Sequence, residues 1–530
     1  MGETIDHTLS PGCRTLLVPP GSTLDILTHA KTAFERDVLP FFLSRSRWFP
    51  ERSEVDISTE VIGFAPLSSE SAMRPCLVLF TARGRGSSGL YSIPVRIVWD
   101  EFEPQAANSK TIAKLQQDSK HGTLIDAAAE PAFIRRLIAD LRRASILRHG
   151  DREVRFNPTS RLQHIDNRPI ENVRSVDGEQ SNSTSLVDNR YVVKIYRRLE
   201  DGVSPEVEVG RFLTDVANFA NTPALLGSVD VTRGETTSAV AVIHEFVENR
   251  GDAWTVLAAA LDRVMETRSS AGSEPAGAAE TELGACQKLI AALGTRLAQM
   301  HAALARHDEF ADFRPVPVSA DHRRHWIDDI LVRAGRVFDR LTGEPFDQAT
   351  VALTQALLAH RGALRSTLEA LLAPATNLLN IRHHGDFHLG QVLVVNDDVF
   401  IIDFEGEPRR SLAERRMKAP AARDVAGLIR SIDYAAGAAL QRAVIPHRDD
   451  PQEIPRRLEQ WRDESVETFI TSYFAAMKDA RLWPTPENEI RQLLRFFLIE
   501  KAFYEIEYEI GHRPEWLTLP LSGALRAFGA

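Results

Sequence analysis

Apolar and polar positions form short alternating segments along the first half of the chain. Alternation of this kind, or a short apolar run, predicts strands at 77–80, 95–98 and 239–247. Helical segments are expected at 23–43 and 131–147. The front part of the chain is therefore predicted to mix strands with helices.

Two local signals add detail to this region. Residues 186–196 predict a β-hairpin, because apolar segments flank the turn-forming pair Asp188 and Asn189. Residues 205–216 predict a helix, because Pro205 suits the first helical position.

The second half of the chain has a mainly helical pattern. It follows a segment rich in Ser, Ala, Gly and Glu at 266–282, which is expected to be a flexible loop. A strand pair at 392–395 and 399–402 interrupts the helices. One buried helical face is marked by apolar residues at three- and four-residue steps: Leu289, Ile290, Leu293, Leu297 and Met300.

Composition narrows the classes of protein that remain. A length of 530 residues predicts two or three domains or lobes. The net charge of −10 disfavours non-specific nucleic-acid binding, which needs a basic surface. Three distant cysteines disfavour a disulfide framework or zinc site. No signal peptide or apolar run of the roughly 20 residues that a membrane span needs is evident, so a soluble cytoplasmic protein is expected.

The strongest candidate for chemistry is the segment from His384 to Asp403. It carries His-Gly-Asp at 384–386, Gln391 five residues after Asp386, and Asp403 after the predicted strand pair. Phosphoryl transfer needs a group that orients the attacking hydroxyl, ligands for Mg²⁺ and a cation on the ATP phosphates. Asp386 can accept the hydroxyl proton, and the side-chain oxygens of Gln391 and Asp403 suit magnesium.

This order of groups matches the H-R-D-x-x-x-x-N and D-F-G segments of protein kinases, with Gly for Arg and Gln for Asn. The alternative is an acidic surface hairpin with an incidental His-Gly-Asp. It would require three polar positions to coincide with a matching strand–turn–strand, and phosphoryl transfer is therefore favoured.

Lys194 is the candidate cation for the nucleotide phosphates. It alternates with apolar residues on the predicted strand 191–196 and can point into a cleft. A carboxylate on the next helix would hold it there; Glu206 and Glu208 both qualify, and Glu208 is favoured. Taken alone, Lys194 is better explained as an exposed edge-strand lysine, but the His-Gly-Asp segment reverses that preference.

The other nucleotide contacts rest on weaker signals. Gln180, Ser181 and Asn182 stand where a glycine-rich loop would precede the strand, and they can bind phosphate oxygens or form a plain polar turn. The strand that ends at Glu245 and Val247 is the candidate for backbone hydrogen bonds to adenine.

Further residues stay open between structural and functional roles. Asp424, at a predicted helix start, suits a cap or loop tether as well as catalysis. Tyr504 and Tyr508 are four residues apart and share one face of a presumed helix. Aromatic rings stack on sugars, so Lys501 and these tyrosines are candidate sugar contacts; a packing helix is the equal alternative. His384 and Glu405 complete the expected sugar contacts.

Together these residues resemble the bacterial maltokinases, relatives of aminoglycoside and choline kinases. The resemblance covers the chain from about residue 40 to the end. Beside the segments above, it rests on Arg-Trp-Phe at 47–49, Asp-Phe-Glu-Gly-Glu-Pro at 403–408 and Arg-Asp-Val-Ala-Gly at 423–427.

The resemblance implies an α+β, bilobal protein-kinase-like fold. Its expected parts are an N-terminal cap subdomain at 1–105, the rest of the α/β N-lobe at 106–247, and a mainly helical C-lobe at 248–530 with the catalytic loop and sugar site. The implied reaction is ATP- and Mg²⁺-dependent phosphorylation of maltose to maltose 1-phosphate, for α-glucan or glycogen synthesis from trehalose. A separate trehalose synthase would be the expected partner.

Two alternatives remain. One is a kinase for another small acceptor, such as glucosamine or an aminoglycoside. The other is a pseudokinase that regulates or binds, which is disfavoured because Lys194, Asp386 and Asp403 are all present.

Overall fold

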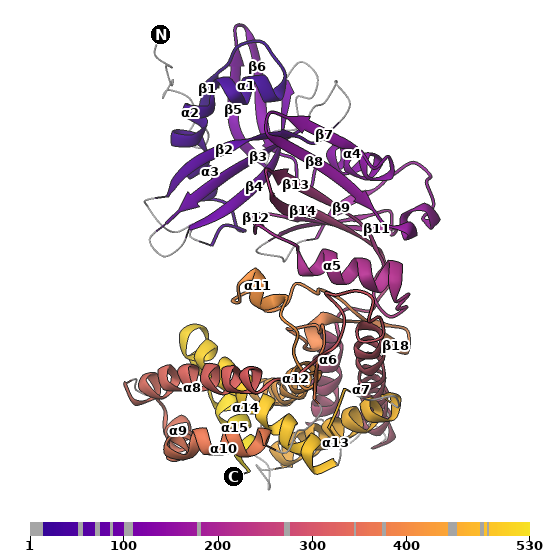
Figure 1. Ribbon diagram of the computed structural model, residues 1–530, viewed down its shortest axis with the longest axis vertical. Helices are drawn as coiled ribbons and strands as arrows, with labels where there is room; N and C mark the ends of the chain where they lie inside the picture. Colours follow the sequence, from indigo (N-terminus) through magenta and orange to yellow (C-terminus); the bar gives the residue numbers. More distant parts are fainter. Residues whose placement is uncertain are drawn as a thin grey trace. The chain divides into compact units, whose positions relative to one another are not determined.

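The computed structural model describes most of the chain, in ranges with gaps. These ranges are 14–50, 57–68, 75–84, 88–99, 110–176, 182–269, 276–343, 346–373, 378–443, 453–477, 482–484 and 487–529. The chain divides into an N-terminal unit, Met1–Asn218 with Pro223–Val247, and a C-terminal unit, Phe219–Thr222 with Glu248–Ala530. The first carries two sheets and the second is mainly helical (Figure 1), so the predicted α+β class is confirmed.

The first sheet has the strand order β1-β5-β6-β4-β3-β2, with β12 paired to β4. Its strands are β1 Thr15–Leu17, β2 Ser58–Pro66, β3 Cys76–Arg83, β4 Ser88–Trp99, β5 Thr111–Gln117, β6 Lys120–Asp126 and β12 Arg198–Leu199. The sheet thus continues past residue 105, where a subdomain boundary was predicted; that boundary stays a prediction. The pair β1–β5 is parallel and its neighbours are antiparallel.

Helices predicted at 23–43 are confirmed beside this sheet. They are α1 Thr23–His29, α2 Lys31–Ala33, a π-helical turn Phe34–Val38 and α3 Leu39–Leu43. Ser22 and Asp25 form a capping box that fixes the start of α1. Ile26, Phe34 and Leu39 are buried in one apolar core with Phe80 of β3.

The second sheet has the order β7-β8-β13-β14-β11-β10-β9. Its strands are β7 Ile146–His149, β8 Arg152–Pro158, β9 Val173–Ser175, β10 Asn182–Val187, β11 Tyr191–Tyr196, β13 Leu225–Arg233 and β14 Thr236–Glu245. The predicted hairpin is confirmed as β10–β11, and Asp188 and Asn189 have φ of 50° and 52° in its turn.

Helices of the N-terminal unit follow the predictions with one exception. Helix α5, Pro205–Arg211, continues as a π-helical turn to Val216, as predicted for 205–216. The helix expected at 131–147 is shorter, because α4 covers Pro131–Arg142 and β7 begins at Ile146. Ala144 has a left-handed φ of 49°, and a right-handed helix cannot continue through a residue in that conformation.

The described residues of the C-terminal unit form a set of packed helices with two small strand pairs. The helices are α6 Ala253–Ser269, α7 Ala276–Leu304, α8 Ala320–Gly343, α9 Gln348–Ala359, α10 Leu364–Leu372, α11 Leu412–Arg415, α12 Ala422–Arg442, α13 Glu453–Ala476, α14 Glu487–His512 and α15 Thr518–Phe528. The strand pairs are β15 Val316–Pro317 with β16 Leu379–Asn380, and β17 Val392–Val395 with β18 Asp398–Ile401.

One prediction for this unit fails and two hold. The segment 266–282 was expected to be a loop, but α6 runs to Ser269 and α7 begins at Ala276; residues 270–275 lie outside the described part. Alanine and glutamate are good helix formers, which explains why residues 266–269 and 276–282 belong to α6 and α7. The strand pair and the buried face of α7 are confirmed.

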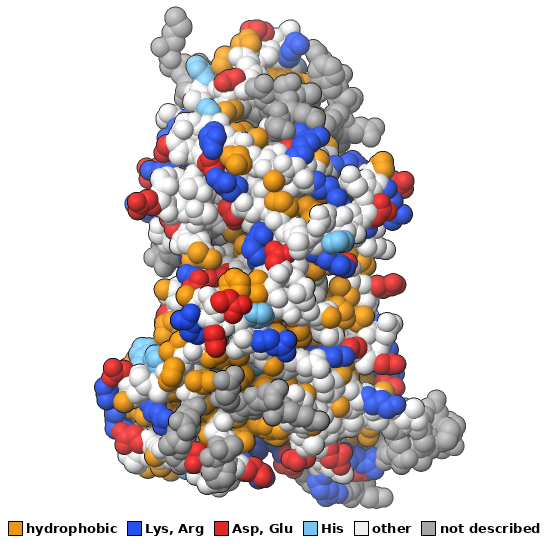
Figure 2. Space-filling model, turned by 45° about the vertical axis from the view of Figure 1, so that its right-hand side comes forward, with side chains coloured by type: hydrophobic (Ala, Val, Ile, Leu, Met, Phe, Trp, Pro, Cys, Tyr) orange, Lys and Arg blue, Asp and Glu red, His pale blue; other side chains and the backbone are white. Residues whose placement is uncertain are grey.

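Surface charge agrees with the mixed composition. Lys and Arg side chains are interspersed with Asp and Glu side chains over the face shown in Figure 2. Among the helices of the described residues, none combines the length and apolar character that crossing a bilayer requires.

Candidate active site

Lys194 lies on a central strand of the second sheet, in register with Thr184 of β10 and Val242 of β14. Its Nζ is 3.3 Å from Glu206 Oε2, at the start of α5. The Tyr196 hydroxyl donates to the same carboxylate at 2.8 Å, and His244 Nε2 lies 3.1 Å from its other oxygen. Because Lys194 is within a sheet, the edge-strand alternative is excluded.

The carboxylate against Lys194 is Glu206, which corrects the preference for Glu208. Glu206 is 4% exposed and shares the buried face of α5 with Val209 and Gly210. Residues two apart on a helix lie on nearly opposite sides, so Glu208 is directed away from this face and is half-buried. Glu206 and Glu208 are both plausible from the sequence, and the choice depends on which side chain lies on the buried face of α5.

Other predicted nucleotide residues are placed with less detail. Asn182 begins β10, whereas Gln180 and Ser181 lie outside the described residues. Glu245 ends β14; its carboxylate is paired with Arg161 at 2.9 Å and its backbone N–H donates to Ala224 O. Val247 follows the strand and is half-buried. Adenine binding by this segment stays a prediction.

In the C-terminal unit, Asp424 at the start of α12 holds the backbone of the His-Gly-Asp loop. His384 N–H donates to Asp424 Oδ2 at 2.7 Å, and Gly385 N–H donates to Oδ1 at 2.9 Å. Gly385 has a φ of 87°, which only glycine adopts without strain. Asp424 is therefore a loop tether, one of the two roles that its position in the sequence allowed.

Asp424 is itself supported from α7. His301, which is fully buried, donates from Nε2 to Asp424 Oδ2 at 3.0 Å. Its Nδ1 then accepts from the hydroxyl of Tyr473 on α13 at 2.7 Å. Burial opposes the charge on Asp424, but the neighbouring histidines, with the hydrogen bond from His301, hold its pKa well below the usual value.

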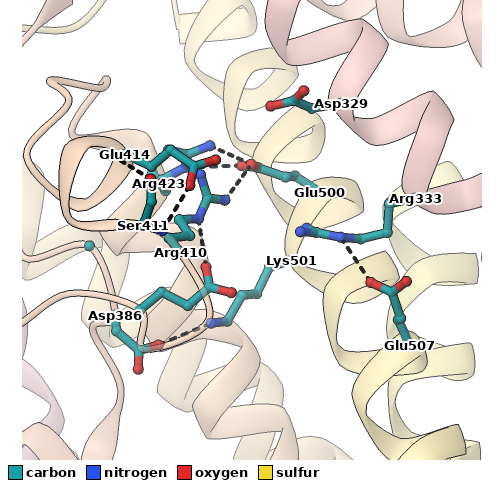
Figure 3. Close-up of polar contacts among 12 residues, drawn as sticks. Asp329, Arg333, Asp386, Arg410, Ser411, Glu414, Arg423, Glu500, Lys501 and Glu507 are labelled. Carbon is teal, nitrogen blue, oxygen red and sulfur yellow. Dashed lines mark hydrogen bonds and ion pairs between the residues drawn. The ribbon is translucent and has the colours of Figure 1, made fainter. Parts of the chain in front are cut away.

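Asp386 is paired with Lys501 of α14 (Figure 3). Nζ of Lys501 lies 3.3 Å from Asp386 Oδ1, and both side chains are largely buried. Burial raises the pKa of Asp386, but the charges of Lys501 and the nearby histidines outweigh it, so the net shift is downward. Burial likewise lowers the pKa of Lys501, yet Asp386 and acidic neighbours raise it overall. The pair stays ionised at neutral pH.

His384, predicted to bind the sugar, points inward instead. It is 2% exposed, and its Nε2 donates to the Ile402 carbonyl at 2.9 Å. Its Nδ1 accepts from Asp386 N–H at 3.4 Å. Both ring nitrogens are thus used within the chain, and the assignment of His384 to the sugar is corrected to a role in joining the loop to the end of the hairpin.

The hairpin β17–β18 places the two predicted magnesium ligands at its open end. Val392 pairs with Ile401, and the next residues outward continue the contact, because Ile402 N–H donates to Gln391 O at 3.0 Å. Asp403 follows immediately, with a φ of 67°. An amide oxygen and a carboxylate at one end of a hairpin are the hard oxygen donors that Mg²⁺ prefers.

Beside Asp386 lies a pocket whose lining was only partly foreseen. It is lined by Arg333, Gly385, Asp386, Phe387, Glu407, Arg410, Arg423, Asp424, Gly427, Phe497, Glu500, Lys501 and Tyr504. Among these residues, Glu500 is held by two arginines: Arg423 pairs with it in bidentate fashion and Arg410 approaches at 3.5 Å (Figure 3). Burial would raise the pKa of Glu500, but Arg423 and Arg410 lower it to about 2.

The sequence analysis singled out neither Glu500 nor the place of Glu407 in this pocket. Glu407 is 7% exposed and pairs with Arg410 at 2.9 Å. The available signal for Glu500 was its position beside Lys501, on a helix already singled out. A buried acid there needs a cationic partner, and the arginines at 410 and 423 flank the loop.

The remaining candidate sugar residues separate into two groups. Tyr504 lines the pocket, and Lys501 Nζ lies 4.9 Å from its ring centroid. Tyr508 is outside this lining and stacks on His512 at 4.5 Å. Glu405 is half-buried in the segment after Asp403, where its carbonyl accepts from Arg415.

Comparison with known proteins assigns the class. The profile of the phosphotransferase enzyme family (APH) matches residues 172–461, more than half of the chain. The chain therefore belongs to this family, whose chemistry the His-Gly-Asp loop and Lys194 had predicted.

The chain is similar to several glucosamine kinases. The chain is 25% identical over 361 residues to a glucosamine kinase from Streptacidiphilus jiangxiensis, covering 66% of this chain and 72% of the relative. It is 24% identical to a glucosamine kinase from Mycolicibacterium smegmatis, covering 66% and 77%. A solved glucosamine kinase in complex with glucosamine, ADP and inorganic phosphate shares the fold, with a TM-score of 0.61, 18% identity and coverage of 90% and 94%.

Proposed function

We propose that this chain is a kinase that transfers the γ-phosphoryl group of ATP to a hydroxyl group of a small sugar. The observation that carries the proposal is the position of Asp386. Its side chain lines a pocket, and the loop that carries it is fixed by two backbone hydrogen bonds to Asp424. Membership of the phosphotransferase family supports the reaction class.

In the proposed reaction an acceptor hydroxyl oxygen bonds to the γ-phosphorus while the bond to the β–γ bridging oxygen breaks. The hydroxyl proton passes to the carboxylate of Asp386, and ADP leaves. Asp386 suits this role because its depressed pKa keeps it ionised at neutral pH. Lys194, oriented by Glu206, neutralises nucleotide phosphate charge.

Mg²⁺ is the cation expected with the nucleotide. Gln391 and Asp403 would hold it, since both residues lie at the open end of the β17–β18 hairpin and carry side-chain oxygens. When bound, it would neutralise charge on the phosphates. Removal of divalent cations with a chelator should abolish turnover, and excess Mg²⁺ should restore it.

Two acceptors compete as the natural substrate. Glucosamine is favoured by the relatives, which are named for phosphorylating it. Maltose is favoured by the resemblance of residues 403–408 and 423–427 to maltokinases. In that second case the product would be maltose 1-phosphate, destined for α-glucan synthesis from trehalose beside a separate trehalose synthase. We place glucosamine first, because the similarity to glucosamine kinases spans two thirds of the chain.

The test is ADP release from purified protein with ATP and Mg²⁺ over a panel of glucosamine, glucose, maltose, trehalose and an aminoglycoside. The proposal predicts sugar-dependent ADP release, fastest with glucosamine. Release with maltose alone would favour the maltokinase alternative. No release above the sugar-free control for any sugar would contradict the kinase proposal and favour a pseudokinase.

A further inference from the structure

Arg197 lies three residues beyond Lys194, where the chain leaves the second sheet of the N-terminal unit. Its side chain is 4% exposed, and its guanidinium donates to both carboxylate oxygens of Asp126, at 3.1 Å and 2.7 Å. Asp126 is the last residue of β6, in the first sheet. A buried bidentate pair fixes orientation as well as distance, so this contact joins the two sheets rigidly.

The same guanidinium reaches two further elements. Its Nε donates to Ser183 Oγ at 3.0 Å, near the start of β10. Its Cζ lies 5.1 Å from the ring centroid of Trp48, within the Arg-Trp-Phe segment. Ser183 follows Asn182, a candidate phosphate contact. One buried side chain thus ties the first sheet and its aromatic segment to the strand that leads away from the predicted phosphate-binding turn.

Backbone contacts secure the chain at the same point. Ser92 of β4 donates from its N–H to Arg197 O and from its hydroxyl to Tyr196 O, both at 2.8 Å. Arg198 then pairs with Tyr91 as β12. The strand that carries Lys194 therefore continues directly into the first sheet.

Opposed contacts hold the end of β11. Tyr196 and Lys194 contact Glu206 on α5, whereas Arg197 contacts Asp126 in the first sheet. A buried arginine is costly unless it is fully paired, and stability alone is served as well by apolar residues. The Arg197–Asp126 pair is therefore better explained by a role in orienting the end of β11 than by a contribution to stability.

We propose that Arg197, paired with Asp126, is a positioning residue for the nucleotide: it anchors the end of β11 and the start of β10 to the first sheet. Lys194, and Asn182 at the start of β10, then keep fixed places for the phosphates. The inference rests on the proposed function, in which Lys194 binds nucleotide phosphate. It gives the first sheet a role in nucleotide binding although none of its residues need touch the nucleotide.

The test compares steady-state kinetics of the full chain with Asp126→Asn and Arg197→Lys. Loss of the fixed geometry should raise the KM for ATP about tenfold and leave kcat and the sugar KM within about twofold. The matched control is Arg96→Lys, which weakens another buried arginine–carboxylate pair of this unit, Arg96–Glu130 at 3.2 Å. That variant should lower the Tm with no change in the KM for ATP.

A merely structural role gives a different result: Asp126→Asn and Arg197→Lys would lower the Tm, as the control does, and leave the KM for ATP unchanged. That outcome would overturn the proposal. Asp126→Asn preserves side-chain size, so it carries the test if Arg197→Lys does not fold.

Hydrogen exchange separates this inference from the proposed function. Backbone amides of 191–196 should exchange faster in Asp126→Asn than in the wild type or Arg96→Lys. If the wild type transfers no phosphoryl group, the proposed function fails, and the exchange result alone then tests whether the Arg197–Asp126 pair anchors β11. Unchanged exchange across 191–196 in Asp126→Asn would contradict the anchoring role.

Discussion

The two charged clusters proposed for catalysis are assembled from segments at very different distances along the chain. In the N-terminal unit, Lys194 is held by Glu206, 12 residues later. In the C-terminal unit, Asp386 is paired with Lys501, 115 residues later, and its loop is clamped by Asp424, 40 residues beyond His384. The first cluster is a strand followed by its next helix, whereas the second requires α12 and α14 to meet the loop.

This difference determines how each cluster should respond to change. The lysine cluster has a buried acid with three polar partners, so the loss of one contact leaves others in place. In the aspartate cluster, Asp386 is itself the proposed base, and the N–H groups of His384 and Gly385 both donate to one carboxylate, that of Asp424. We therefore expect larger effects from substitutions in the C-terminal unit.

The largest expected effect is that of Asp386→Asn. An amide cannot accept the hydroxyl proton, so kcat should fall about a thousandfold, within the usual contribution of a general base. Nucleotide affinity, measured by calorimetry, should stay within a few-fold of the wild type. Wild-type turnover in this variant would show that the base lies elsewhere.

Asp424→Asn should have the next largest effect. The amide keeps one acceptor oxygen, so the loop loses one of its two charged hydrogen bonds and the support from His301 is weakened. We expect kcat to fall about a hundredfold through misplacement of Asp386, and the Tm to fall. The control is Asp397→Asn, in the exposed turn of the β17–β18 hairpin, which should change neither value.

Glu206→Gln against Glu208→Gln tests the corrected partner of Lys194. Loss of the buried charge at 206 should raise the KM for ATP about tenfold, since the lysine loses its charge-assisted partner. The same change at 208 should leave the KM within about twofold, because that side chain lies off the buried face. Equal effects, or a larger one at 208, would restore the original assignment.

The smallest effect concerns pH. Lys501 lowers the pKa of Asp386, so Lys501→Met should raise that pKa. Because the base must be ionised, activity is present above this pKa and is lost as pH falls through it. The acid limb of the kcat profile should therefore move to higher pH. Lys288→Met, on an exposed position of α7, is the control, and an acid limb that stays in place would argue against the coupling.

Much of the local structure was predictable, because local patterns encode it. The hairpins β10–β11 and β17–β18 and the face of α7 followed from turn residues and periodicity. The helix expected to reach Leu147 ends at Arg142, shortly before the left-handed Ala144, and an alanine gives no sequence signal for that conformation. The loop expected at 266–282 is largely replaced by the ends of α6 and α7, because composition does not exclude helix when its residues favour it.

The site was predictable where chemistry is concentrated in one segment. Asp386, Gln391 and Asp403 lie within 18 residues, and Lys194 lies in a clear strand. Glu500 and its arginines were harder to find, because a position beside Lys501 does not by itself show that packing buries an acid on a long helix. The inward position of His384 likewise depends on the Ile402 carbonyl, which the hairpin brings back to it.

The most direct test of the central claim is phosphorus NMR of ATP, Mg²⁺ and glucosamine incubated with the wild type and with Asp386→Asn. We predict a sugar phosphate ester signal that grows in step with ADP in the wild type and is absent in the variant, although the variant binds ATP. Formation of inorganic phosphate alone by the wild type, or of the ester at an undiminished rate by the variant, would contradict the account.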